Sequence, residues 1–532
     1  MKTRKFMTIW AAFSLLLAGW TSCVDDTSSL GGGNAPEIII TGMDPEKAVE
    51  INSYTGVNLK DVIKPQVSAN IPEDRLSYAW YLFSTAEAEG NYRDFLISSE
   101  KEPDYEINLK TGSYEVVFEV TSQADGYTQV ATATLNASTT FSRGFYILKE
   151  TPDGATELDL YSSGLYMPDL MEQMLGAPLA GKPYNLCTYY NGEYINPDNN
   201  ETDCANFIYV FTEDKKFRGF RAEDMMNIWS NDNLLYSGAL EADEQPCTFF
   251  RTIFSHAYVA NKGIYSIMSG DGGWMPYSSG RYGYPTVAVG GSKFVQEAEV
   301  GMYYVFWSDA DHKLYSTDYN VMTSEEVTLK DAMGVPVPDA YPDDLECIAS
   351  GKNYLAGTST LFFLCQQPST GDRYLFLLHG STSISQIVRL DPSSHLAHAT
   401  SVSANGLTAA YIYFVDGGRL YVYGLNDGKE QEVNLPGIPA GEEVTFVSNQ
   451  YLNLAYVSTD YNFDDLIVGT QSGDTYKLYF YESDRVSTGV PVDEPSFTVT
   501  GTGKVKSVRF LAPVSVDGTY LNMMTNPFPF SD

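Results

Sequence analysis

The sequence predicts an all-β protein in which an immunoglobulin-like sandwich precedes a β-propeller. Three observations predict this architecture. Runs of alternating apolar and polar residues follow one another between residues 36 and 138. Beyond them, paired apolar runs meet across short turns seven times between Gly154 and Gly473. The chain also contains 39 tyrosines and 27 phenylalanines, and aromatic residues favour strands over helices.

Residues 35–140 are predicted to form the sandwich. Their strands include "LSYAWYLF" at 76–83 and "TGSYEVVFEVTSQ" at 111–123, both with a period of two. Trp80 occupies the place where such a sandwich buries an indole, and Tyr114 opens a later strand as in a tyrosine corner. We therefore expect one sandwich domain in this segment.

Residues 141–532 are predicted to form the propeller. The clearest hairpin is "YIYFVDGGRLYVYGL" at 411–425, where Gly417 and Gly418 can supply the positive φ angles of a tight turn. From Gly154 to Gly473 the hairpins recur with a mean period of roughly 53 residues, which is typical of stacked β units. We expect seven blades, with eight as the alternative. The run "KVKSVRFLAP" at 504–513 is a candidate closing strand that completes the first blade and removes free sheet edges.

A short helix is predicted within this β-rich region. "MPDLMEQMLG" at 167–176 has apolar residues at helical spacing and ends in glycine.

The first 22 residues have the organisation of a secretory signal. Three basic residues precede an apolar run from Phe6 to Trp20, which is short for a bilayer span of about 20 residues. The following Thr21, Ser22 and Cys23 resemble the lipobox of bacterial lipoproteins, although that family usually has leucine at the position of Trp20. The resemblance implies cleavage before Cys23 and a lipid on its side chain. Membrane attachment would then occur through this anchor.

Residues 23–34 are predicted to be a flexible tether, because they are polar and rich in glycine. Asp25 and Asp26, just behind the cysteine, resemble the surface-export signal of Bacteroidota-type lipoproteins. This likeness implies a location on the outer membrane that faces the cell exterior.

The charge of the chain excludes one class of ligand. Its formal net charge is −35, and loss of the three basic residues in 1–22 would make it −38. Such a field repels nucleic acid, so we expect no nucleic-acid binding.

The cysteines beyond Cys23 number five, and five is odd. Cys187 and Cys204 flank a polar loop and could form a disulfide. No spacing is that of a CxxC motif, so a structural zinc site is not expected.

Candidate catalytic and metal motifs are weak. "HLAH" at 395–398 lacks the glutamate of H-E-x-x-H, and "GTGK" at 501–504 lacks the remaining residues of a phosphate loop. The acidic pairs at 309 with 311 and at 464 with 465 could act as acid and base or hold calcium, but we expect solvated turn residues. No catalytic residue, cofactor or metal site is predicted.

The segment "SGDGGWMPYSSGRYGYP" at 269–285 is the best candidate for a binding loop, because connections of this length are often functional. It interleaves glycines with Trp274, Tyr277, Tyr282 and Tyr284, whose aromatic faces would suit a sugar or the surface of a partner. The alternative is that the loop packs its own aromatic rings over the neighbouring blade.

The pattern G-x-Y-x-V-x-F-x-V at 112–120, together with "GFYILKE", "TELDLYS", "FDDLIVGTQSGDTYKLYFYE" and "GTGKVKSVRF", is similar to the PKD-like family lipoproteins of Bacteroidota. The W-D-F-G-D-G turn of PKD domains is absent. The resemblance implies a role beside a surface import system that consists of a TonB-dependent porter and its lipoprotein lid. It implies no catalytic residues.

Three functions remain open from the sequence. The first is a non-catalytic surface protein that captures a glycan or a peptide for a TonB-dependent import system. The second is a hydrolase or lyase that acts on surface glycans with carboxylates from separate blades, since propellers also host enzymes. The third is an adhesion or assembly module.

Overall fold

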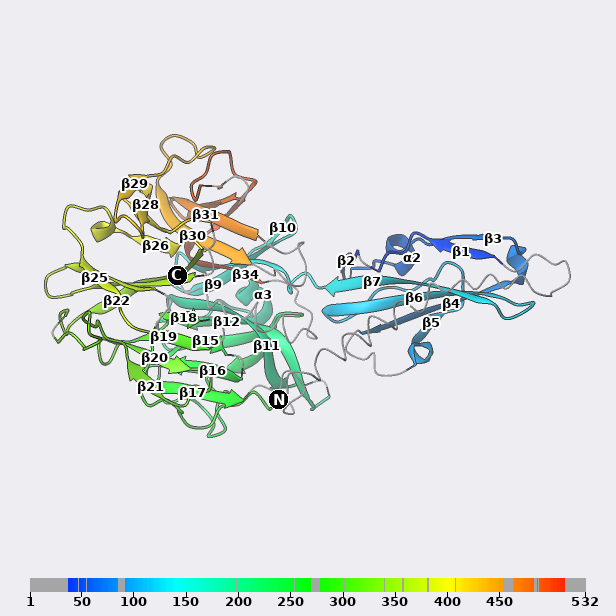
Figure 1. The fold of residues 1–532 in the computed structure, drawn as a ribbon, viewed down its shortest axis with the longest axis horizontal. Helices are drawn as coiled ribbons and strands as arrows, with labels where there is room; N and C mark the ends of the chain where they lie inside the picture. The colour runs from blue at the N-terminus through cyan, green and yellow to red at the C-terminus, as the bar shows by residue number, and fades with distance from the viewer. Residues whose placement is uncertain are drawn as a thin grey trace.

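The computed structural model describes residues 37–511, except for residues 46, 54, 85–90, 198, 253, 269–277, 300–301, 339, 356–357, 380–381, 407, 453–462, 483–485 and 487. An elongated sandwich projects from one end of a rounded propeller (Figure 1). The predicted signal peptide, the tether and Cys23 lie outside the described residues.

The sandwich consists of two sheets around one apolar core. The larger sheet has the order β2-β7-β6-β4-β5, and β1 pairs with β3 in the smaller sheet. The strands are β1 (Ile38–Thr41), β2 (Val49–Asn52), β3 (Gln66–Ala69), β4 (Leu76–Ser84), β5 (Leu96–Ser98), β6 (Gly112–Ser122) and β7 (Thr128–Ser138), with the short helices α2 (Leu59–Val62), η2 (Glu73–Arg75) and η4 (Tyr92–Phe95) between them.

Two side chains confirm the predicted sandwich core. Trp80 is fully buried, and its ring centroid lies 4.3 Å from that of Phe118. Its Nε1–H donates to the carbonyl oxygen of Glu100 at 3.0 Å. The hydroxyl of Tyr114 donates to the carbonyl oxygen of Lys110 at 3.1 Å, which is the contact of a tyrosine corner.

Seven sheets follow, one for each predicted hairpin. The first contains β8 (Gly144–Glu150), β9 (Thr156–Ser162), β10 (Leu165–Met167) and β34 (Lys504–Leu511). Blades 2 to 4 contain β11 (Pro183–Ile195), β12 (Thr202–Thr212), β13 (Phe217–Arg221), β14 (Met226–Ser230), then β15 (Pro246–Arg251), β16 (Ser255–Ala260), β17 (Gly263–Met268), then β18 (Val295–Glu299), β19 (Tyr303–Ser308), β20 (Lys313–Asp318) and β21 (Ser324–Glu326).

Blades 5 to 7 repeat the four-stranded pattern. They contain β22 (Glu346–Leu355), β23 (Thr358–Gln366), β24 (Arg373–His379), β25 (Gln386–Arg389), then β26 (Ser401–Ala404), β27 (Tyr411–Asp416), β28 (Arg419–Gly424), β29 (Glu430–Glu432), then β30 (Val444–Leu452), β31 (Phe463–Ser472), β32 (Thr475–Tyr481) and β33 (Phe497–Thr502).

The far end of the chain closes the ring. Strand β34 pairs antiparallel with β8, with Leu511 opposite Gly144 and Ser507 opposite Leu148. It is the innermost strand of blade 1, because it contacts the innermost strands β11 and β30 of the two neighbouring blades. The predicted closing strand is therefore confirmed, with its end at Leu511.

A separate apolar cluster fills each space between consecutive blades. Seven such clusters occur, and the last joins blade 7 to blade 1 through Phe480, Ile467, Phe145 and Val508. The rings of Phe145 and Phe480 lie 4.8 Å apart. These interblade clusters bury the faces of each blade against its neighbours and form the core of the ring.

Side chains satisfy the inner edges of the innermost strands. Arg509 Nε–H donates to the carbonyl oxygen of Leu186 in the next blade at 3.1 Å. Between blades 6 and 7, the Ser403 hydroxyl accepts from the Asn449 N–H at 2.9 Å. Edge strands carry unpaired backbone groups, so these contacts stabilise the inner edges of the blades.

Local turn and helix predictions are also confirmed. Gly417 and Gly418, between β27 and β28, have φ angles of 54° and 78°. Helix α3 (Leu170–Leu175) ends at Gly176, whose φ of 82° is left-handed.

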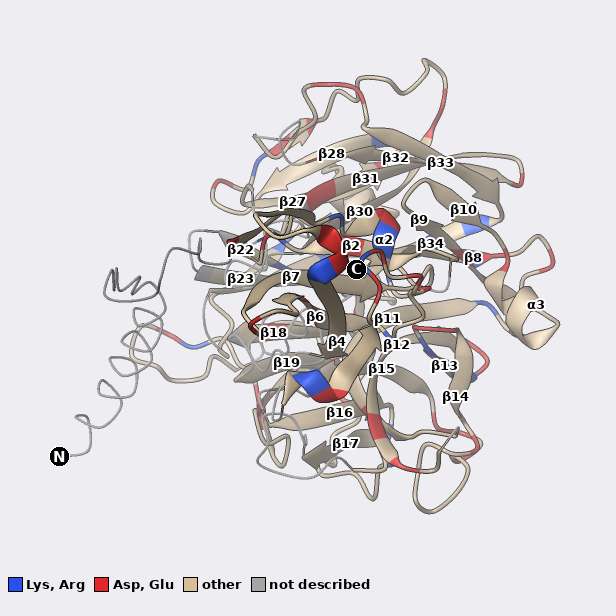
Figure 2. Cartoon of the chain, turned by 90° about the vertical axis from the view of Figure 1, so that its right-hand side faces the viewer, with Lys and Arg blue, Asp and Glu red and all other residues tan. Residues whose placement is uncertain are grey.

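The sandwich contacts the end of the propeller where the innermost strands finish. The N–H of Thr111 donates to Glu223 Oε1 at 3.1 Å, and the Thr139 hydroxyl donates to the carbonyl oxygen of Glu223 at 2.9 Å. Figure 2 looks onto this end, with β4 and β6 of the sandwich in front of the central part of the propeller. We call it the sandwich-side end.

Candidate functional site

The described part of the predicted binding loop lies between blades 2 and 3 and then runs along the outermost regular strand of blade 3. Trp274 and Tyr277 lie outside the described residues. The described part begins where the N–H of Ser278 donates to Glu193 Oε2 at 2.5 Å, near the sandwich-side end. It then follows β17 as far as Val287, which pairs with Ile264. Blade 3 has three regular strands, and this segment takes the place of the fourth.

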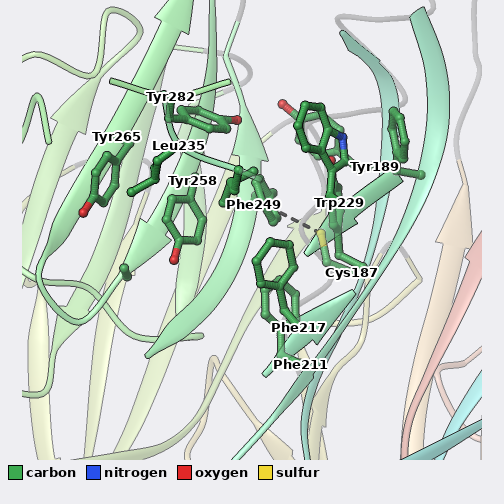
Figure 3. Close-up of a cluster of buried hydrophobic side chains, with 14 of the residues drawn as sticks. Cys187, Tyr189, Phe211, Phe217, Trp229, Leu235, Phe249, Tyr258, Tyr265 and Tyr282 are labelled. Carbon is green, nitrogen blue, oxygen red and sulfur yellow. Dashed lines mark hydrogen bonds between the residues drawn. The ribbon is translucent and has the colours of Figure 1, made fainter. Parts of the chain in front are cut away.

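Tyr282 is part of the core between blades 2 and 3. Its side chain is 4% exposed, and its ring lies 5.8 Å from that of Tyr258 and 6.2 Å from that of Phe249 (Figure 3). This placement corrects the prediction that Tyr282 binds a ligand, because an interblade ring offers no free face. The alternative reading, a loop that packs its own aromatic rings, holds for this residue.

Two tyrosines of the same region are exposed. Tyr284 is 87% exposed, so its predicted binding role stays a prediction. Tyr236 is 63% exposed, its N–H donates to the carbonyl oxygen of Tyr282 at 2.9 Å, and its hydroxyl is hydrogen-bonded to Ser279 Oγ at 2.6 Å. No sequence pattern indicated Tyr236, since it lies alone in the connection between blades 2 and 3.

A larger group of exposed apolar side chains lies on the sandwich-side end of blades 3 and 4. Strand β17 runs toward the sandwich (Figure 1), so its last residue lies at this end. The other members occupy the turn after β15, the start of β19 and the segment after β20. We call this group the apolar face, and it consists of the exposed residues Phe254, Met268, Tyr303 and Met322 together with the half-buried Tyr319, which packs against Phe254.

The apolar face rests on an ordered support. The rings of Phe254 and Tyr319 lie 5.5 Å apart in an edge-on arrangement. The Thr252 hydroxyl donates to the carbonyl oxygen of Tyr319 at 2.6 Å and so joins the turn of blade 3 to the segment of blade 4. Val321 is fully buried beneath them. Contiguous apolar surface on a soluble body is typical of interaction sites.

A buried polar network lies near the axis at the same end. His256 Nδ1 is hydrogen-bonded to the Tyr189 hydroxyl at 2.5 Å, and its Nε2 lies 3.6 Å from Glu193 Oε1. Burial, and then the charge of Arg251, lower the pKa of His256 well below its usual value. Burial likewise raises the pKa of Tyr189 far above its usual value. Both groups therefore stay neutral at physiological pH.

A buried ion pair joins blades 4 and 5. Lys352 Nζ lies 2.7 Å from Glu297 Oε2, and the Tyr304 hydroxyl donates to Glu297 Oε1 at 3.4 Å. Both charged side chains are buried. Pairing of this kind neutralises the charges inside the ring and orients neighbouring strands.

The HLAH and GTGK motifs, for which no catalytic role was predicted, have structural roles. His395 Nδ1 lies 2.7 Å from Asp416 Oδ2, and His398 Nε2 is hydrogen-bonded to the carbonyl oxygen of Pro392 at 2.8 Å. Within the described ranges, no cluster of histidine, cysteine and acidic residues could hold a metal ion. "GTGK" joins β33 to β34.

The two acidic pairs of the sequence differ in their exposure to solvent. Asp309 and Asp311 lie in the turn between β19 and β20 and are exposed, as expected, but partial burial of the carboxyl, and then the charge of Glu346, raise the pKa of Asp309 to about 6. Asp464 and Asp465 are instead buried in β31, and Asp464 Oδ1 accepts a hydrogen bond from Asn449 Nδ2 at 2.7 Å. The expectation of solvated turn residues is wrong for this pair.

The suggested disulfide is not formed. All five cysteines beyond residue 23 are free and buried. Cys187 lies opposite Tyr209, whereas Cys204 lies opposite Glu193, so the register of β11 and β12 holds the two thiols at different levels of the sheet.

A small cavity of about 240 Å³ lies at the other end of the propeller, between blades 1 and 7. Glu150, Asp153, Asp474 and Lys504 are among its lining residues. Its walls are polar turns, so it lacks the apolar surface that a ligand pocket usually offers.

The fold therefore defines a two-domain all-β protein, an Ig-like sandwich followed by a seven-bladed propeller. Residues 34–183 match the model of the PKD-like family. This range covers the sandwich and the first strands of the propeller. No curated protein matches the sequence.

The solved structures to which the chain is similar include three bacterial proteins. A quinonprotein alcohol dehydrogenase-like protein from Bacteroides thetaiotaomicron has 12% identity and a TM-score of 0.39, over 90% of this chain and 100% of that one. BamB from Moraxella catarrhalis has 11% identity and a TM-score of 0.29, over 68% and 86% of the two chains. A protein of unknown function from Bacteroides thetaiotaomicron has 10% identity and a TM-score of 0.28, over 80% and 96%.

Over the part of the chain that the structure describes, no helix has the length and apolar character needed to cross a membrane.

Proposed function

We propose that the protein is a non-catalytic binding protein of the cell surface. It captures a nutrient ligand, a glycan or a peptide, and passes it to a TonB-dependent import system. The observation that carries this proposal is the apolar face, where five large apolar side chains gather at one end of the propeller. Aromatic anchors of this kind contribute most of the energy of many binding interfaces.

The chemistry beneath the apolar face supports binding over catalysis. A general base needs a pKa near the working pH and access to its substrate. His256 is fully buried and its pKa is far below that range, because burial disfavours its charged form. Glu297 is buried and paired with Lys352. In this proposal His256, Glu297 and Lys352 connect neighbouring strands and do not take part in a reaction.

The order of segments supports a role at a membrane. The predicted lipid on Cys23 and the tether 23–34 precede the sandwich, so the sandwich separates the anchor from the propeller along the chain. The apolar face lies at the sandwich-side end of the propeller. A ligand held there would lie on the side from which the anchor extends, where a porter and its lipoprotein lid could receive it.

Binding arrays test the proposal. A soluble body of residues 34–532 should bind members of a glycan array or a peptide library. Combined Phe254→Ala and Tyr319→Ala substitutions should weaken binding about 10-fold or more, since each anchor at a binding hot spot contributes more than about 1 kcal/mol. Met333→Ala is the matched control, because Met333 is exposed but lies in the connection between blades 4 and 5.

Two results would contradict the proposal. Equal binding by the double variant and the parent would remove the apolar face from the site. Turnover of a bound glycan would favour the hydrolase or lyase. Purification from the native envelope tests the partner, since a porter and its lid should accompany the full chain.

A further inference from the structure

We infer that the apolar face binds a polypeptide segment that carries apolar side chains with basic residues beside them, and not a glycan. This inference rests on the proposed function and deepens it, because it commits to one of its two ligand classes. Three features of the face support it.

The first feature is its composition. Met268 and Met322 are exposed beside the three aromatic residues. Methionine is unbranched and polarizable, so it adapts to side chains of different shape and is frequent at surfaces that accept many partners. A nutrient peptide varies in sequence, and such a surface tolerates this variation. Sugar rings gain little from a thioether.

The second feature is that three hydroxyl groups at the face already donate to backbone carbonyl oxygens. A glycan needs hydrogen-bond donors and acceptors for its hydroxyl groups beside the stacking ring. The hydroxyls of Thr252, Ser255 and Ser266 at the apolar face instead donate to the carbonyl oxygens of residues 319, 320 and 321, respectively. The edge-on rings of Phe254 and Tyr319 also form no shared flat platform. The surface therefore favours apolar side chains.

The third feature is charge. Asp318 precedes Tyr319, and Glu325 follows Met322 by three residues. Among the described residues neither carboxylate forms an ion pair with a basic side chain. The whole chain carries a formal charge of −35, which attracts cationic ligands and raises their association rate. Basic residues that flank an apolar peptide core would lie near these carboxylates.

Labelled peptides test the inference directly. Two peptides share one core of leucine, phenylalanine and methionine, and carry lysines or glutamates at both ends. Fluorescence polarization with residues 34–532 should show binding of the lysine peptide about 3-fold to 10-fold tighter, since exposed ion pairs contribute about 0.2–1 kcal/mol each. This advantage should shrink at high salt. Neutral oligosaccharides should not compete.

Two double variants separate the contribution of the carboxylates from that of the methionines. Asp318→Asn with Glu325→Gln should abolish the preference for the lysine peptide and leave the binding of an uncharged core peptide unchanged. Met268→Ala with Met322→Ala should weaken binding of both peptides. Met333→Ala should change neither the preference for the lysine peptide nor the affinity for either peptide.

The alternatives give distinct results. Oligosaccharide binding that depends on Phe254 and Tyr319, without peptide binding, would overturn the inference and keep the proposed function. Absence of any ligand whose binding depends on these residues would overturn both. Light scattering could instead show that residues 34–532 self-associate and that the double methionine variant does not. This result would assign the face to a second copy of the chain and would also overturn the inference.

Discussion

Replacement of Lys149 by methionine should destabilise the junction between the first and last blades. Lys149 Nζ lies 2.6 Å from Asp159 Oδ1 and 2.7 Å from Asp169 Oδ1, and its side chain is 1% exposed. The hydroxyls of Tyr166 and Tyr476 donate to Asp159 Oδ2 at 2.8 and 2.6 Å. Tyr476 comes from blade 7, so this network joins the two ends of the ring.

The expected magnitude follows from burial. Lys149→Met keeps a straight apolar side chain but leaves the charge of Asp159, which is fully buried, without its cation. Removal of one partner from a buried ion pair costs about 3–5 kcal/mol. Equilibrium urea unfolding of residues 34–532, followed by tryptophan fluorescence, measures this loss. A second substitution, Asp159→Asn, should recover part of the loss because it removes the uncompensated charge.

An exposed ion pair provides the control. Lys313 Nζ lies 3.0 Å from Glu326 Oε1, with both side chains more than one-third exposed. Lys313→Met should cost about 0–1 kcal/mol, because water screens such pairs. Equal unfolding free energies for the Lys149 and Lys313 variants would show that the buried ion pair does not stabilise the junction.

Three further predictions concern single positions and thiols. Gly280→Ala should lower the unfolding midpoint, because φ is +71° and a Cβ there would lie 1.8 Å from the carbonyl oxygen of Glu193. Gly283→Ala is the control and should be neutral, since no atom lies within 4 Å of its Cβ. Equal midpoints for the two variants would show that the loop is not packed as described. Burial raises the pKa of Glu244, although two tyrosine hydroxyls donate to its carboxylate and oppose the shift. The folded parent therefore keeps a proton that the unfolded chain loses above the ordinary glutamate pKa of about 4.3. As the pH rises from that value through the raised pKa, the parent should lose stability relative to Glu244→Gln. Urea unfolding at several pH values measures this difference, and a constant difference would contradict it. Thiol titration of denatured, unreduced residues 34–532 should count all five cysteines as free, and a deficit of two would indicate a disulfide.

The sequence predicted the ring because the hairpin turns are local. Each hairpin joins the second and third strands of one sheet, and its turn residues, such as Gly417 and Gly418, report the backbone geometry directly. The number of such turns gave the number of blades. The closing strand was predictable because an unpaired apolar run remained after the last hairpin.

The candidate site was harder to predict because residue type does not report burial. Tyrosine is suited both to a core and to a binding surface, so Tyr282 and Tyr284 read alike in the sequence. The apolar face combines residues from two blades, including Phe254 and Tyr319, that are far apart along the chain. Local patterns contain no signal for contacts set by the packing of one blade on the next. The same limit applies to Asp464, which packing buries in a strand.

Photo-crosslinking from the apolar face tests whether ligands bind there. A photoreactive amino acid at position 254 of residues 34–532 should form covalent adducts with bound peptides from a library. The same group at position 284, which is exposed at the outer edge of blade 3, should form far fewer. Equal adduct yields at the two positions, or adducts at position 284 alone, would contradict the assignment of ligand capture to the sandwich-side end.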